Sequence, residues 1–125
     1  MALSAVVANL ERQHAVYSEM AAVLAQQRAA LTARDTEALD AANGRQARLA
    51  DALGTLEAER QGLAAALPGA PLRLRDLLDL AVEGSLHDRL PLLRDQLPPL
   101  VERVQHLTRT NRALAADAGA SAAHL

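Results

Sequence analysis

Apolar residues recur along this chain at alternating steps of four and three positions, in three long runs. This alternation has the period of the stripe that one α-helix turns toward a partner helix. The first run comprises Leu3, Val7, Leu10, His14, Tyr17, Ala21, Leu24, Arg28 and Leu31. The second comprises Leu39, Ala42, Gln46, Leu49, Leu53, Leu56, Arg60, Leu63 and Leu67. The third comprises Leu86, Leu90, Leu93, Leu97, Leu100, Val104, Leu107, Asn111, Leu114 and Ala118. We call these runs the first, second and third seams, and they predict three long helices.

A short polar linker, Thr32–Thr36, separates the first two seams. Asp35 is suited to cap the second helix, because its carboxylate can accept a hydrogen bond from an early backbone N–H. So short a linker predicts an antiparallel hairpin in which Leu10 lies near Arg60. Arg60 then has two interpretations. It either buries its aliphatic stem and extends its charge to water, or pairs with Glu11 and thereby sets the register of the hairpin.

Prolines and glycines mark the remaining boundaries. The sequence Pro68–Pro71 predicts the end of the second helix, since proline removes a backbone donor and clashes with the preceding turn. Residues Leu72–Val82 predict a short helix and Glu83–Ser85 a turn. Asn43-Gly44 could end a helix, but the second seam keeps its phase there, which favours continuity. Pro98-Pro99 predicts a kink or a split, and the unbroken third seam favours a kink.

Composition agrees with a helical fold. Half of the residues are hydrophobic, mostly Ala and Leu, with one Tyr and no Phe or Trp. Ala and Leu are strong helix formers, whereas strands favour β-branched and aromatic residues. Val16, Met20 and Val23 lie beside the first seam, so the first helix is expected to pack on two neighbours. We therefore predict an all-α protein: an elongated antiparallel bundle of three long helices plus one short helix, with one domain at 1–118 and a flexible tail at 119–125.

Several classes of function receive no support from the sequence. There is no cysteine, hence no disulfide or thiolate site. The first residues lack the pattern of a signal peptide, and no run of residues is apolar enough to cross a membrane. The formal net charge is −2, without a basic block. We therefore expect a cytoplasmic protein that binds neither nucleic acid nor membranes.

One pair of residues invites a metal-binding interpretation. Glu11 and His14 form a Glu-x-x-His motif, which di-iron bundles use in two copies together with further carboxylates. The other Glu–His pairs here have the wrong spacing, and no Glu lies on a seam. The sequence also lacks a glycine-rich phosphate loop and a nucleophile motif. We predict no metal site, no cofactor and no enzymatic activity.

Five short elements together resemble a known family. They are Tyr17, Arg28–Leu31, Asp35–Leu39, Leu56–Arg60 and Asn111–Leu114. Their order and separation are similar to those of the FlgN family of flagellar type III export chaperones, over residues 3 to 118. The sequence departs from the family pattern at Thr108, where the family has Asn, and at Arg45-Gln46, where the family has an acidic-basic step.

The resemblance implies a cytosolic chaperone that binds hook–filament junction proteins and delivers them to the flagellar export gate. It implies no cofactor, and it places the cargo on the C-terminal amphipathic helix. We call the expected partner-binding residues the C-terminal stripe: Leu100, Val101, Val104, Leu107, Asn111 and Leu114.

The C-terminal stripe is expected to be open in the monomer. Val104 and Leu107 should therefore accept Asp without unfolding the protein, while cargo capture is lost. Two alternatives remain: a structural coiled-coil protein that pairs with copies of itself, for example as a homodimer, or a regulatory helical adaptor.

Overall fold

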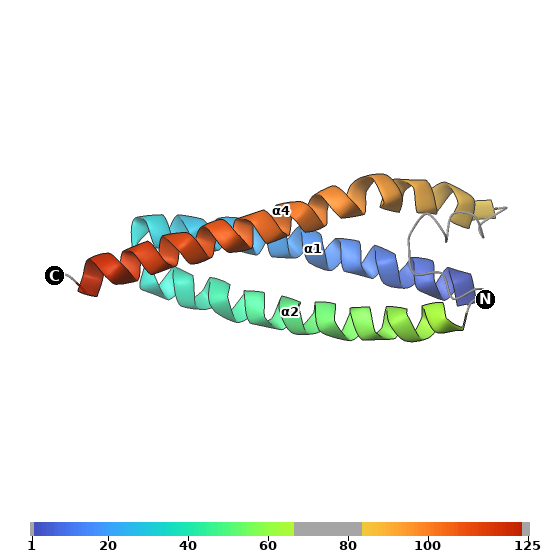
Figure 1. Cartoon of the computed structure of the whole chain (residues 1–125), viewed down its shortest axis with the longest axis horizontal. Helices are drawn as coiled ribbons and strands as arrows, with labels where there is room; N and C mark the ends of the chain where they lie inside the picture. The colour runs from blue at the N-terminus through green and yellow to red at the C-terminus, as the bar shows by residue number, and fades with distance from the viewer. Residues whose placement is uncertain (1, 67–83, 124–125) are drawn as a thin grey trace.

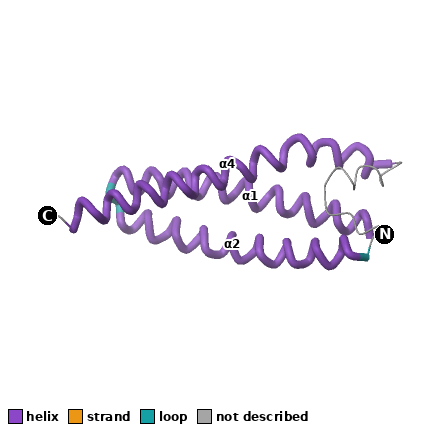
Figure 2. Tube along the Cα trace, viewed as in Figure 1, coloured by secondary structure: helices purple, strands orange, loops and turns teal. Residues whose placement is uncertain are grey.

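A computed structural model of the protein describes residues 2–66 and 84–123. These residues form three helices and no strand: α1 (Ala2–Ala33), α2 (Thr36–Ala65) and α4 (Gly84–Ala123) (Figures 1 and 2). The prediction of an all-α fold with three long helices is confirmed. The break at Pro68–Pro71 and the short helix at Leu72–Val82 lie outside the described residues.

The hairpin between α1 and α2 forms where the linker predicts it. The backbone N–H of Ala38 donates to the Asp35 carboxylate at 3.0 Å, so Asp35 is the N-cap of α2 as expected. At the end of α1, Arg34 adopts a positive φ of 55°. The N–H of Arg34 donates to the Leu31 carbonyl, and the N–H of Asp35 to the Ala30 carbonyl. This is the Schellman arrangement, in which glycine usually takes the left-handed position that Arg34 occupies here.

α1 is the central helix of the structure. It packs against both α2 and α4, whereas α2 and α4 have few direct contacts with each other. This confirms that the first helix has two neighbours. α2 runs antiparallel to α1, and α4 returns parallel to α1, beginning beside the start of α1 (Figure 1).

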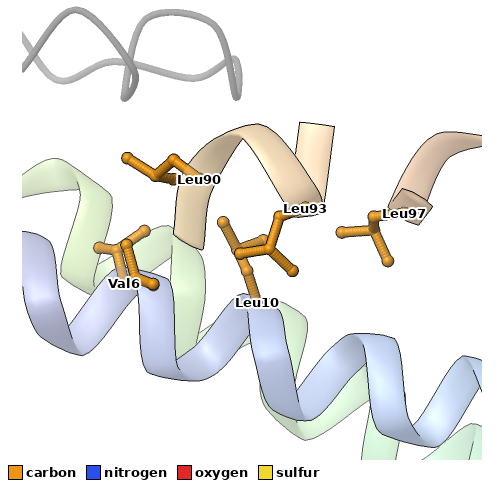
Figure 3. Packing of buried hydrophobic residues seen from close by; sticks show 6 residues of the cluster. Val6, Leu10, Leu90, Leu93 and Leu97 are labelled. Carbon is orange, nitrogen blue, oxygen red and sulfur yellow. The ribbon is translucent and has the colours of Figure 1, made fainter. Parts of the chain in front are cut away.

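The first hydrophobic cluster joins the beginnings of α1 and α4. Val6, Val7 and Leu10 of α1 meet the buried leucines of α4 (Figure 3). Those leucines are Leu90, Leu93 and Leu97. Leucines at third-seam spacing thus place one face of α4 on α1, as the periodicity predicts.

The second hydrophobic cluster lies nearer the hairpin. Its buried members are Met20, Leu24 and Val104. Partly buried side chains from all three helices pack around it: Tyr17, Ala21, Leu49, Leu53 and Leu107. Tyr17, a residue of the first seam, borders both clusters and so packs against the core.

α2 is the least buried of the three helices. Its only fully buried residues among those described are Ala42 and Ala64. The leucines of the second seam are half-buried instead, because α4 packs on α1 and leaves this side of α2 partly open. α2 is continuous through Asn43-Gly44, as expected from the unbroken seam.

α4 runs as one helix through Pro91, Pro98 and Pro99, so the double proline does not split it. Pro98 and Pro99 lie on its exposed side. The carbonyls that lose a helical donor there belong to Arg94 and Asp95, which are also exposed, so water can satisfy them. Figure 1 shows the axis of α4 bending over its first half. The predicted turn at Glu83–Ser85 is wrong in part, because α4 already begins at Gly84.

A polar network ties α1 to α2. Asn9 is fully buried, and its Nδ2 donates to the Leu56 carbonyl at 2.9 Å and to Glu59 Oε1 at 3.2 Å. Gln13 donates to Asn9 Oδ1 at 2.8 Å, and Arg12 pairs with Glu59 at 2.6 Å. Buried polar groups are tolerated when they are hydrogen-bonded to one another in this way.

Of the two interpretations of Arg60, the pair with Glu11 does not occur. Arg60 pairs with Glu57 on its own helix, and Glu11 pairs with Arg89 on α4. The predicted register is nevertheless right, since Arg12 and Glu59 pair across the hairpin one position away. The error lies in the face assigned to Glu11, which is turned toward α4.

The ionisation of Tyr17 tests whether this side chain packs against the two hydrophobic clusters. Burial and the nearby Glu57 carboxylate raise the pKa of the Tyr17 phenol above its ordinary value of 10.0. Because Tyr17 is the only Tyr and there is no Trp, an alkaline absorbance titration reports this group alone. We expect a midpoint above 10 in the native protein.

In denaturant the midpoint should return to about 10. The stability that the neutral phenol provides is complete below this ordinary pKa, and is lost as the pH rises through the raised native pKa. Glu57→Gln should lower the native midpoint, because it removes the nearby charge. Equal midpoints in the native and denatured protein would show that Tyr17 is not packed.

Candidate partner-binding surface

The C-terminal stripe lies on the second half of α4, and its residues divide into two groups. Leu100, Val101, Leu107 and Leu114 are half-buried. Leu107 borders the second cluster and Val101 the first, whereas Leu100 and Leu114 border neither. Leu100 and Leu114 therefore present apolar surface that the folded protein covers only in part.

Val104 and Asn111 form the other group. Val104 is 7% exposed within the second cluster, and Asn111 is 2% exposed. The expectation that the whole C-terminal stripe is open is therefore wrong at these two positions. The reason is that α4 lies parallel to α1 and turns the Val104 side of its seam onto Met20 and Leu24.

Asn111 belongs to a series of amide hydrogen bonds that joins all three helices. Its Nδ2 donates to the Leu24 carbonyl at 2.8 Å and to Gln27 Oε1 at 2.9 Å. Gln27 Nε2 in turn donates to Asn43 Oδ1 and Gln46 Oε1, each at 2.7 Å. Gln46, one polar residue of the second seam, and Asn111, the polar residue of the third, are thus joined through Gln27.

α4 extends beyond the hairpin that supports it (Figure 1). Gln27, which bonds Asn111, lies six residues before the end of α1 at Ala33. Asn111 lies twelve residues before the end of α4 at Ala123. At 1.5 Å per residue, α4 therefore projects about 9 Å past α1. The last turns continue the helix through 119–123, and the division into a domain at 1–118 and a tail at 119–125 stays a prediction.

The second half of α4 is locally basic. No acidic residue occurs between Glu102 and Asp117, while Arg103, Arg109 and Arg112 lie there, all exposed. None of these arginines takes part in an ion pair within the described residues. A partner with an apolar face and acidic flanks would therefore find complementary charge on this half of the helix.

The other end of α4 carries a smaller hollow against α1. A cavity of about 200 Å³ lies between the two helices, with Glu11, His14 and Arg89 among its lining residues. Glu11 is engaged by Arg89, and hydrogen bonding to Glu11 raises the pKa of the Arg89 guanidinium. Among the described residues no three His, Cys, Asp or Glu side chains come together as a metal site. Leu92, which lies beside this cavity and off the third seam, is 59% exposed.

The fold and this surface define a class of protein: an elongated α-helical bundle with a projecting, half-exposed amphipathic helix. None of the described helices is long and apolar enough to span a membrane.

The family model of the FlgN protein matches residues 1–123, almost the whole sequence. The protein therefore belongs to the FlgN family, whose members are flagellar export chaperones, and the resemblance noted in the sequence is confirmed. Comparisons with curated proteins and with solved structures found no match.

Proposed function

We propose that this protein binds hook–filament junction proteins in the cytosol through the second half of α4 and delivers them to the flagellar export gate. Membership of the FlgN family supports the chaperone role. The observation that carries the proposed site is the partly exposed apolar surface of Leu100 and Leu114 on a helix that projects past its supports.

The physical basis is the exchange of one helical partner for another. Apolar surface left open on an amphipathic helix is stabilised when a second amphipathic helix packs along it. Export cargo whose termini form helical coiled coils in the assembled filament would offer such a helix. Binding to α4 would keep those termini from associating before export. No catalytic step, metal or cofactor takes part in this function.

Within the C-terminal stripe the residues would have two roles. Leu100, Val101, Leu107 and Leu114 would contact cargo with their exposed surface. Val104 and Asn111 would position α4, because they hold it on α1 and have little surface left to offer. A cargo that needed Val104 directly would first have to displace α4 from α1.

A double variant, Leu100→Asp with Leu114→Asp, tests the site. Both residues lie outside the two hydrophobic clusters, so the variant should remain folded. Two charges on the apolar face should weaken the capture of purified hook–filament junction proteins from the same bacterium by at least about a hundred-fold. Isothermal titration calorimetry measures this loss, and circular dichroism checks the fold.

The matched control carries the same charges at exposed positions, Gln105→Asp with Ala116→Asp, and should bind normally. If the folded Leu100/Leu114 variant binds junction proteins as tightly as the parent, the site lies elsewhere. If the parent binds no junction protein and sedimentation shows only self-association, the protein acts as a coiled-coil partner of itself and the proposal fails.

A further inference from the structure

A second cavity lies at the hairpin end, where all three helices meet. Its volume is about 320 Å³, and Leu31, Leu39 and Ala115 form its apolar lining. Its polar lining comes from Gln27 of α1, Asn43 and Gln46 of α2, and Thr108, Asn111 and Arg112 of α4. No acidic residue lines it. The cavity thus combines amide groups and one guanidinium with no negative charge.

One acceptor in this lining is unpaired. Asn111 is almost completely buried, yet its Oδ1 has no hydrogen-bond partner. The orientation of this amide is well determined, because the Leu24 carbonyl can only accept and so must face the Asn111 NH₂ group. A buried acceptor without a hydrogen-bond partner destabilises the folded protein, because the atom has lost its hydration and gained nothing in return. A donor from a bound molecule would remove this cost.

Donors are available beside it. Asn43 and Gln46 use their side-chain oxygens to accept from Gln27, which leaves their NH₂ groups without a partner in the described part of the structure. The Arg112 guanidinium adds up to five N–H donors in a planar fork that matches a carboxylate. The cavity therefore offers one acceptor surrounded by donors and a positive charge.

We propose that this cavity binds a carboxylate group of the partner protein, together with a neighbouring N–H that donates to Asn111 Oδ1. Arg112 and the free amide groups of Asn43 and Gln46 hold the carboxylate. The carboxylate belongs either to an Asp or Glu residue of the partner or to the partner's carboxyl terminus. This inference rests on the proposed function, since it gives the cargo surface on α4 a polar anchor beside its apolar residues.

Small probes test the site without the cargo. N-acetylaspartic acid N-methylamide stands for the carboxylate of Asp or Glu with its backbone N–H groups, and N-acetylglycine for a carboxyl terminus. N-acetylasparagine N-methylamide and N-acetylglycinamide are their neutral isosteres. Each is titrated into ¹⁵N-labelled protein at constant ionic strength, and NMR follows the side-chain NH₂ signals of Asn43, Gln46 and Asn111. We expect saturable shifts with the carboxylates and at least about ten-fold weaker binding of the neutral isosteres.

Arg112→Gln should weaken carboxylate binding by at least about ten-fold, as expected for a lost charge-assisted hydrogen bond. Arg109→Gln is the matched control, because Arg109 is also exposed on α4 but does not line the cavity. Tighter binding of N-acetylglycine than of N-acetylaspartic acid N-methylamide would support the partner's carboxyl terminus as the source. Tighter binding of the aspartic acid derivative would support an Asp or Glu residue.

Three results would overturn the proposal. They are the absence of saturable shifts, equal shifts with the neutral isosteres, and equal weakening by both arginine variants. The first would leave the cavity as a site for ordered water only. None of these results depends on cargo capture, so the Leu100/Leu114 experiment can succeed or fail independently.

Discussion

Val104→Asp is expected to unfold most of the protein at neutral pH. Val104 is buried against Met20 and Leu24, with no described cation or amide at the cluster to receive a carboxylate. Burying an unpaired charge costs about 4 kcal/mol or more. Since small domains are stable by about 5–15 kcal/mol, this variant loses a large part of its free energy of unfolding. Circular dichroism and urea denaturation measure the loss.

Gln105→Asp is the matched control, because the next residue along α4 is exposed and receives the same carboxylate. Its free energy of unfolding should stay within about 0.5 kcal/mol of the parent. A Val104→Asp protein that melts like the Gln105→Asp protein would show that the second half of α4 is not packed on α1. The sequence-based expectation that Val104 tolerates Asp would then be restored.

Leu90→Ala should destabilise the protein by about 3–4 kcal/mol. Leu90 has no exposed surface and packs in the first cluster with Val6 and Val7. Removing its side chain leaves a cavity between α1 and α4, so the loss combines reduced apolar burial with empty volume. Urea denaturation followed by circular dichroism gives the free energy of unfolding.

Leu92→Ala is a closely matched control on the same helix. Leu92 is 59% exposed, so its truncation should change the free energy of unfolding by less than about 0.5 kcal/mol. If the two variants have equal stability, the start of α4 does not pack on α1. The parallel arrangement of these two helices would then be incorrect.

Features set by local chemistry were predictable from the sequence. The hairpin at Thr32–Thr36 and the Asp35 cap follow from hydrogen bonds between residues close in the sequence. The continuity of α2 through Asn43-Gly44 follows from the phase of its seam. The antiparallel direction and the register of α1 and α2 were also predicted correctly, because so short a linker permits few other arrangements of the two helices.

The buried polar residues between α1 and α2 were harder to predict. Asn9 and Gln13 lie one heptad before Val16 and Met20, on the same side of α1. Both residues are buried, but because they are polar, the apolar periodicity does not include them. A search for polar residues at the same heptad positions would have found them.

The candidate site was predictable only in part. The seam identifies Leu100, Val104 and Leu114 as one face of α4, but it cannot say how much of that face α1 covers. That depends on the lateral position of α4 over α1, which is determined by packing between residues far apart in the sequence. The unpaired oxygen of Asn111 arises from the same long-range packing.

The central position of α1 has a consequence for how the molecule can open. Since α2 and α4 scarcely touch, α4 can swing away while the α1–α2 hairpin keeps nearly all of its own contacts. The free energy of that opening is the free energy of one interface, below that of global unfolding, which makes it a sub-global transition. In the opened state Val104, Leu97 and the face of α1 beneath them would become accessible together.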